Sequence, residues 1–99
     1  MQQAYIDALY DLAEQDARVI SLLSDSGTDY DRYFIRDFPK QCINFGIAEE
    51  NQVAAAAGMA SMGKIPFVYT SGAFLVYRSL EFLRDDICLR KANVKLVGM

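Results

Sequence analysis

Residues 44–58 read NFGIAEENQVAAAAG and place the carboxylates of Glu49 and Glu50 where a short strand becomes an apolar helix. Residues 53–60 are small or apolar on every side, which is typical of a helix that is covered all round. Because glutamate is almost never fully buried without a partner, one of the two carboxylates should meet a donor from this chain or from a ligand. The alternative is that both only favour a helix N-terminus, where negative charge meets the positive end of the macrodipole.

The hydrophobic pattern on either side of this stretch predicts alternating helices and strands. Buried strands are expected at residues 18–24, 41–45, 65–70 and 94–97. Helices are expected at 2–15, at 48–62 with Gly63 closing it, and at 73–91, with a loop or short helix over 25–36. Such alternation indicates parallel strands joined by right-handed crossovers. The expected fold class is α/β, a doubly wound, mostly parallel sheet with helices on both faces.

The helix expected over residues 73–91 has two distinct faces at helical spacing. Its apolar face would hold Val76, Leu80, Leu83 and Ile87. Its charged face would hold Arg78, Glu81 and Asp85. The apolar face should therefore pack on the sheet.

Length and composition limit the architecture to one domain over residues 1–99. The last predicted strand runs into the final residues, and natural domains seldom stop in a core strand without a cap or a polar tail. We therefore expect a fragment or an incomplete subunit that lacks sequence at its C-terminal side. The hydrophobic fraction of 53% suggests an interface as well as a core, although a sheet covered on both faces would give the same composition.

Charge and residue usage exclude several kinds of site. A net charge of −3 argues against a nucleic-acid surface, and the lack of histidine removes the usual acid–base side chain near neutral pH. Cys42 and Cys88 stand far apart, so neither a CxxC pair nor a zinc site can be drawn, and a reducing cytoplasm is expected. No stretch is long and apolar enough to cross a bilayer, so we expect no membrane contact.

Three loops should meet at the carboxyl ends of the predicted strands, where ligands gather in open α/β sheets. They begin at Ser24, Gly46 and Thr70, and would bring Asp25, Glu49 and Phe74 to one rim. An acidic group beside an aromatic ring suits a flat heteroaromatic ligand. For Asp25, a cap after the strand is an equally good reading, and Phe74 could simply fill the core.

Four segments together resemble the pyrimidine-binding domain of transketolase and of 1-deoxyxylulose-5-phosphate synthase, especially the C-terminal subunit of split transketolases. They are AYIDALYDLAEQDARVI (4–20), INFGIAEENQVAAAAGMASMGKIPFV (43–68), FLVYRSLEFLRDDI (74–87) and NVKLVG (93–98). The most specific part is the G-I-x-E motif ending at Glu49, at a fitting distance from the helix that starts with Phe74.

The resemblance implies thiamine diphosphate as cofactor. In that family the glutamate at the position of Glu49 contacts N1′ of the aminopyrimidine, and sharing a proton there favours the tautomer whose own nitrogen activates the thiazolium carbon. Phe74 matches the aromatic residue against the pyrimidine, Tyr77 a neighbouring aromatic position, and Asp25 an aspartate near the cofactor. For Tyr77, core filling is the alternative. Glu50 is expected at a subunit contact.

The sequence also departs from the family. An arginine near the start and a serine after the first strand, both used for a sugar phosphate, are replaced by Met1-Gln2-Gln3 and by Asp29. The G-D-G segment and the downstream asparagine that hold the diphosphate and Mg²⁺ are absent, so those ligands are expected on a partner domain.

The expected function is thiamine diphosphate-dependent transfer of a two-carbon ketol unit between ketose and aldose substrates. The chain would be a transferase component, inactive alone, in a homo- or hetero-oligomer with a diphosphate-binding transketolase subunit or domain. The alternatives are a catalytically silent interaction domain or fragment, and the decarboxylating condensation of 1-deoxyxylulose-5-phosphate synthase.

Overall fold

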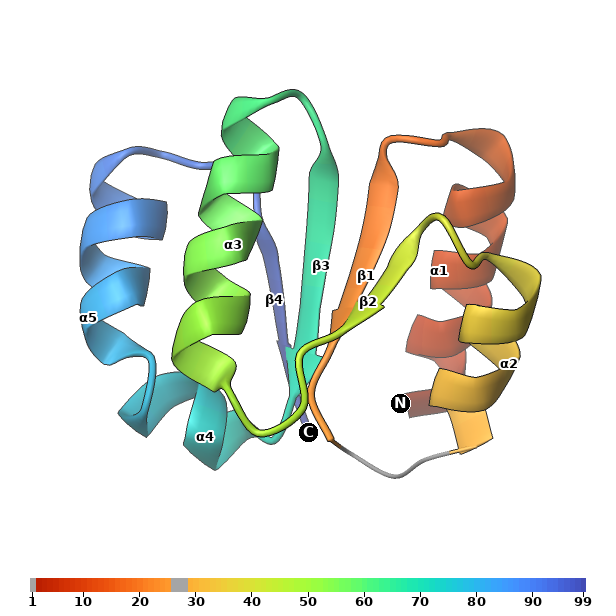
Figure 1. Ribbon diagram of the computed structural model, residues 1–99, viewed down its shortest axis with the longest axis horizontal. Helices are drawn as coiled ribbons and strands as arrows, with labels where there is room; N and C mark the ends of the chain where they lie inside the picture. Colours follow the sequence, from red (N-terminus) through yellow and green to blue (C-terminus); the bar gives the residue numbers. More distant parts are fainter. Residues whose placement is uncertain (1, 26–28) are drawn as a thin grey trace.

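A four-stranded parallel sheet forms the centre of the protein (Figure 1). The structure, a computed structural model, describes residues 2–25 and 29–99, and no side chain of residues 29–31. The strands are β1 (Val19–Leu23), β2 (Cys42–Asn44), β3 (Ile65–Thr70) and β4 (Lys95–Gly98). They lie in the order β2-β1-β3-β4, and every pair is parallel. The predicted α/β class and all four predicted strands are confirmed.

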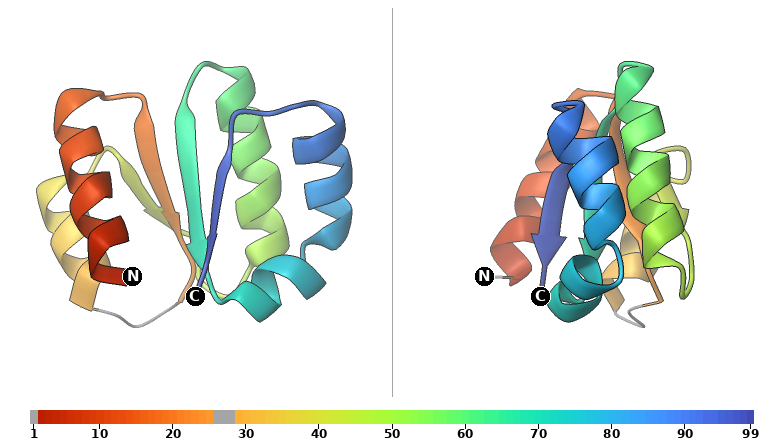
Figure 2. Two further views of the ribbon diagram at one scale, coloured as in Figure 1. Left: turned by 180° about the vertical axis from the view of Figure 1, so that it is seen from behind. Right: turned by 90° about the vertical axis from the view of Figure 1, so that its left-hand side faces the viewer.

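Helices cover both faces of the sheet, as expected for a doubly wound fold (Figure 2). One face is covered by α1 (Gln2–Gln15) and α2 (Asp29–Asp37). The other is covered by α3 (Glu49–Ser61), α4 (Gly72–Tyr77), α5 (Leu80–Phe82) and the π-helix η1 (Leu83–Leu89). The segment over 25–36, predicted as a loop or short helix, contains most of α2.

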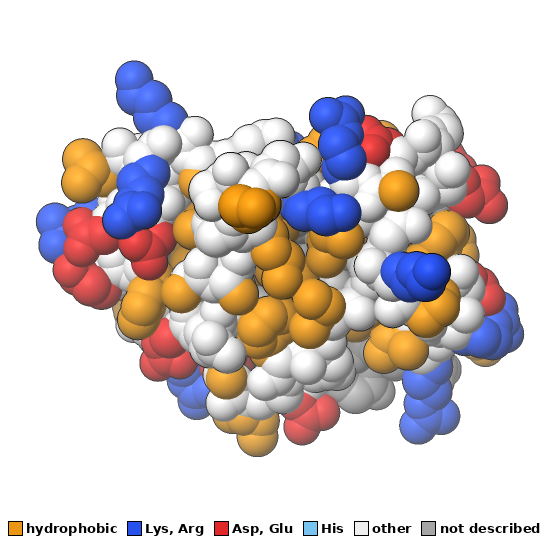
Figure 3. Space-filling view, turned by 45° about the horizontal axis from the view of Figure 1, so that its top comes forward, with side chains coloured by type: hydrophobic (Ala, Val, Ile, Leu, Met, Phe, Trp, Pro, Cys, Tyr) orange, Lys and Arg blue, Asp and Glu red, His pale blue; other side chains and the backbone are white. Residues whose placement is uncertain are grey.

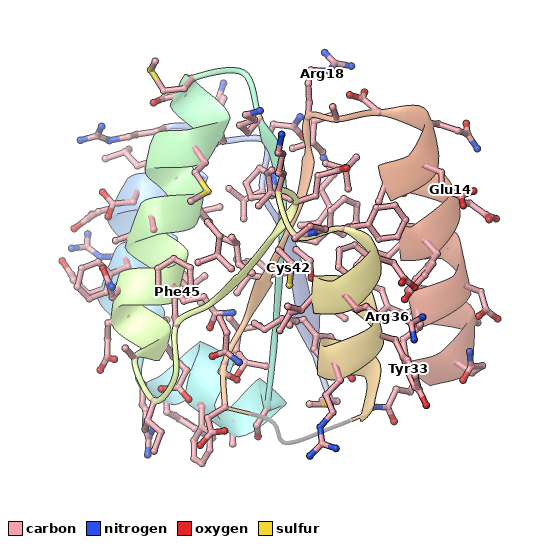
Figure 4. All side chains as sticks on the ribbon, turned by 45° about the vertical axis from the view of Figure 1, so that its right-hand side comes forward. Glu14, Arg18, Tyr33, Arg36, Cys42 and Phe45 are labelled. Atoms are coloured by element: carbon pink, nitrogen blue, oxygen red, sulfur yellow. The ribbon has the colours of Figure 1, made fainter. Side chains whose placement is uncertain are left out.

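Alternate side chains of the strands enter two separate cores. Val19 and Leu23 pack toward α1 and α2, whereas Ile20 and Leu22 pack toward α3 and η1. Because both faces are buried, β1 is apolar at nearly every position rather than alternating with polar residues. In Figure 4, Cys42 lies toward α2, and Phe45, just beyond β2, lies beside α3.

The single helix predicted over residues 73–91 is wrong, because the chain turns between α4 and α5. Ser79 at this break has φ −103° and ψ 8°, outside the helical region. Val76 and Leu80, predicted on the buried face, are 48% and 59% exposed. Ile87 is buried as predicted, and Leu75, which was not predicted on that face, is buried as well. Neither proline nor glycine marks the break, so the periodicity of the sequence does not reveal it.

Helix α3 packs on the sheet through one side only, which corrects the expectation that residues 53–60 are covered all round. Gln52, Val53 and Ala56 are buried, whereas Gly58 is exposed.

Apolar side chains gather in the middle of the face that Figure 3 shows. Ile43 of β2 and Met62 after α3 are among the large apolar residues that remain exposed. Within residues 2–25 and 29–99, no helix has the length and apolar character to span a membrane.

Candidate functional site

The loops after β1, β2 and β3 enclose a cavity of about 410 Å³ at the carboxyl edge of the sheet. Its lining includes Asp25, Glu49 and Phe74, the three residues that the sequence predicted at one rim. A cavity of this size suits one small ring system. A slightly larger hollow of about 480 Å³ lies between α3 and the residues after η1, but no aromatic ring lines it.

A tight turn carries the chain from β2 into α3 and positions Glu49. The backbone N–H of Gly46 donates to Asn44 Oδ1 at 2.7 Å, and Gly46 has φ +66°, a conformation that favours glycine. The backbone N–H of Asp25 donates to the carbonyl of Gly46 at 3.1 Å, so the loop after β1 is fixed to the same turn. Glu49 is then the first residue of α3, where its negative charge meets the positive helix end.

The Glu49 carboxylate is buried, with 4% of its side chain exposed, and its partner is Arg78. Arg78 Nη1 donates to Glu49 Oε2 at 3.1 Å. This confirms that a carboxylate of the acidic pair meets a donor from this chain. The sequence predicts Arg78 on the charged face of one long helix. In the structure, Arg78 is the C-cap residue of α4, and its guanidinium contacts Glu49.

Phe74 and Arg78 are also in contact with each other. The guanidinium carbon of Arg78 lies 4.0 Å from the centre of the Phe74 ring, a cation–π arrangement. The two residues are four apart, which places them on the same side of a helix. That spacing is the signal in the sequence that could have identified Arg78 as part of the site.

Two hydroxyl groups lie in the wall of the cavity. Ser24 Oγ and Thr70 Oγ1 are 2.6 Å apart and both residues are buried. Ser24 directly follows β1, and Thr70 is the last residue of β3. The bond therefore joins the two central strands where the loops of the site begin. It also connects these loops on the side of the cavity that faces the sheet.

The other positions singled out in the sequence lie at the rim of the cavity, away from it, or outside the described residues. Tyr77 is 84% exposed and does not line the cavity in the described part of the chain, so its role toward a ligand stays a prediction. Asp25 is exposed at the rim. Met1 and the side chain of Asp29, which stand at positions where the sequence departs from the family, lie outside the described residues. Among the described residues, no group of three acidic, cysteine or histidine side chains could hold a metal ion.

The cavity combines two features that fit a protonated, flat nitrogen heterocycle. The carboxylate of Glu49 can accept a hydrogen bond from a ring N–H, and the ring of Phe74 offers a stacking surface. An aminopyrimidine has both properties. The residues present therefore fit the pyrimidine part of thiamine diphosphate.

Comparison with known proteins gives one consistent family. The family model for the pyrimidine-binding domain of transketolase matches residues 1–99. A 6-deoxy-6-sulfo-D-fructose transketolase subunit of Clostridium sp. (strain MSTE9) is 33% identical over 99% of this chain and 31% of its own length. A 1-deoxy-D-xylulose-5-phosphate synthase of Oryza sativa subsp. japonica is 37% identical over 92% of this chain and 13% of its own.

A solved structure shares the fold closely. It is described as a split-gene transketolase, an inactive beta4 tetramer, and superposes with a TM-score of 0.88 at 35% sequence identity. The match covers 98% of this chain and 33% of that one. The present chain therefore spans about a third of the length of the transketolase subunit and of the solved chain.

Proposed function

Because the chain belongs to the transketolase pyrimidine-binding domain family, we propose that it forms the aminopyrimidine-binding half of a thiamine diphosphate site in a ketol transferase. The observation that carries this proposal is the buried carboxylate of Glu49 facing a cavity that Phe74 also lines. Burial of a carboxylate costs free energy even when it is paired, and its position in the wall of a cavity favours a role in binding.

Each side chain has a distinct task in this proposal. Glu49 holds a proton at N1′ of the pyrimidine, and Phe74 stacks against the ring. Asp25 and Tyr77 contact the cofactor from the rim. Bound thiamine diphosphate supplies the thiazolium carbon through which a two-carbon unit passes from a ketose to an aldose. The sequence has no histidine, and none is needed at N1′, because the carboxyl group of Glu49 holds the proton there.

The diphosphate and Mg²⁺ are assigned to a partner. The diphosphate-binding G-D-G segment is missing from the sequence, so a second subunit or domain must bring it. Two findings support an assembly: one relative is named as a subunit, and the solved neighbour as a tetramer. The exposed apolar side chains of Ile43 and Met62 offer surface for such contacts. We further propose that the 99 residues are one domain of a larger or split enzyme. We also propose that the enzyme works in the reducing cytoplasm, where cysteines such as Cys42 and Cys88 remain reduced thiols.

Calorimetric titration tests the proposal directly. Thiamine diphosphate with Mg²⁺ is titrated into this chain mixed with a subunit that carries the G-D-G segment, with each protein alone as a control. Binding only in the mixture supports a shared site. The Glu49→Gln variant, which keeps a hydrogen-bond acceptor for Arg78, should still assemble but lose ketol transfer. Unchanged turnover by that variant would remove Glu49 from the mechanism.

Two alternatives give different results in the same experiment. A silent interaction domain would assemble with the partner but bind no cofactor in any combination. A synthase-type reaction, suggested by the similarity to 1-deoxy-D-xylulose-5-phosphate synthase, would release carbon dioxide from a 2-oxo acid donor. Ketol transfer from a ketose releases none.

A further inference from the structure

We propose that the guanidinium of Arg78 takes the place of the aminopyrimidine in the ligand-free site and must leave Glu49 and Phe74 when the ligand enters. This inference rests on the proposed function, because it concerns the same cavity. It makes Arg78 an internal competitor that sets how tightly, and with what selectivity, the ring is bound.

The contacts of Arg78 are those that the ligand requires. Its guanidinium is flat and positively charged, it lies 4.0 Å from the centre of the Phe74 ring, and it donates to Glu49 Oε2 at 3.1 Å. A protonated aminopyrimidine would stack on the same ring and donate to the same carboxylate. The Glu49 side chain is only 4% exposed, so it has little room for a second donor from solvent.

The position of Arg78 in the chain allows it to move. It caps the short helix α4, next to the break at Ser79, and its side chain is 43% exposed. The guanidinium can therefore turn toward solvent while α4 and its Phe74 stay in place. Arg78 lines the cavity, so its departure also enlarges the space available to a ring.

Displacement by a ligand requires that the buried carboxylate receive another donor. A neutral aromatic ring could replace the stacking contact but would leave Glu49 as a buried, unpaired charge, which is strongly unfavourable. A ring that carries a proton on nitrogen satisfies both residues. Arg78 therefore makes the site selective for protonated nitrogen heterocycles over other flat ligands.

The test compares cofactor affinity in variants of the assembled complex. Thiamine diphosphate with Mg²⁺ is titrated into complexes that carry wild-type chain, Arg78→Met or Arg78→Lys, with Arg84→Met as the matched control. Arg84 pairs with Glu81 on the surface, away from the cavity. Removal of the competing ion pair and cation–π contact should tighten binding roughly five- to thirtyfold for Arg78→Met. Arg78→Lys keeps the positive charge but not the flat guanidinium group, so its affinity for the cofactor should lie between those of wild type and Arg78→Met.

Nuclear magnetic resonance of the Arg78 side chain gives a second readout without turnover. In the free complex its Nε–H and Cδ protons should be shifted by the Phe74 ring current, and addition of thiamine diphosphate should move them to the values of a solvated arginine. Persistence of the ring-current shift in the bound complex would overturn the proposal. Circular dichroism confirms that each variant is folded.

The outcomes separate this proposal from the proposed function. Equal or weaker binding by Arg78→Met, with wild-type binding intact, overturns the displacement of Arg78 and leaves the cofactor assignment standing. Absence of binding in every variant, Arg78→Met included, overturns both.

Discussion

The hydroxyl groups of Ser24 and Thr70 lie 2.6 Å apart in the wall of the cavity and join the carboxyl ends of the two central strands. Both residues are buried, so each hydroxyl has the other as its near partner. We expect Thr70→Val to lower the free energy of unfolding by about 1–2 kcal/mol, because it leaves the hydroxyl of Ser24 unpaired. Urea denaturation monitored by circular dichroism measures this loss.

A double-mutant cycle isolates the contact between the two residues. In Ser24→Ala/Thr70→Val no unpaired hydroxyl remains, so the double variant should lose less than the two single losses together. Strict additivity would mean that the two hydroxyl groups do not stabilise one another.

Phe74 and Tyr77 provide a second pair of variants, which separates binding from stability. Phe74 lines the cavity and is partly exposed, so Phe74→Leu should weaken thiamine diphosphate binding about two- to tenfold in the assembled complex. Tyr77 is almost fully exposed, so Tyr77→Ala should change the free energy of unfolding of the chain by less than about 0.5 kcal/mol. If Tyr77 reaches the cofactor when the partner is present, Tyr77→Ala also weakens binding there. Unaltered affinity of that variant in calorimetry would exclude Tyr77 from the site.

Local sequence signals were sufficient for the strands and for the rim of the site. The runs that became β1 and β3 are short, apolar and bounded by polar residues or glycine, which fixes their ends. Parallel strands then bring Asp25, Glu49 and Phe74 to one edge, as topology requires. These features follow from residues close together in the chain, so they can be derived without any tertiary contact.

Tertiary contacts decide the features that the sequence did not predict. The break at Ser79 carries no proline or glycine, and the contact of Arg78 with Glu49 joins residues that lie 29 positions apart in the chain. One side of α3 stays uncovered because no other element packs on it in the described part of the chain. The periodicity of residues within one helix does not show which other elements pack against it. A donor for one of the two carboxylates, Glu49 or Glu50, was predicted, but neither the choice of Glu49 nor its partner was.

Gln52 is a further residue whose role only the fold reveals. It is fully buried on α3, and its side-chain Nε2 donates to the carbonyl of Leu22 at 2.7 Å, which ties the helix to β1. Gln52→Ala should lower the free energy of unfolding by about 2–4 kcal/mol, because it removes the bond and leaves a cavity. The neighbouring Asn51 is exposed, so Asn51→Ala is the matched control. Similar urea midpoints for the two variants would contradict this role.

Asp16 predicts how stability depends on pH. Hydrogen bonds from the Arg18 side chain and backbone lower the pKa of Asp16 from 3.8 to about 2. Because the folded pKa lies below the unfolded one, the contribution of Asp16 is present above about pH 4 and is lost as the pH falls toward 2. Asp16→Asn should therefore reduce the loss of stability over this window. Urea midpoints measured from pH 2 to 6 test it, and identical curves for variant and wild type would refute it.

Two glycines should respond to alanine in opposite directions. A Cβ at Gly98 would lie 2.9 Å from the Cα of Gly72, where β4 passes the start of α4, so the backbone must shift. Gly98→Ala should cost about 1–3 kcal/mol of unfolding free energy and, by moving the helix that carries Phe74, weaken cofactor binding. A Cβ at Gly58 in α3 meets nothing within 4 Å, and Gly58→Ala should stabilise the chain by about 0.5–1 kcal/mol. Thermal unfolding of both variants checks the signs, and a stabilised Gly98→Ala would show that β4 and α4 do not approach so closely.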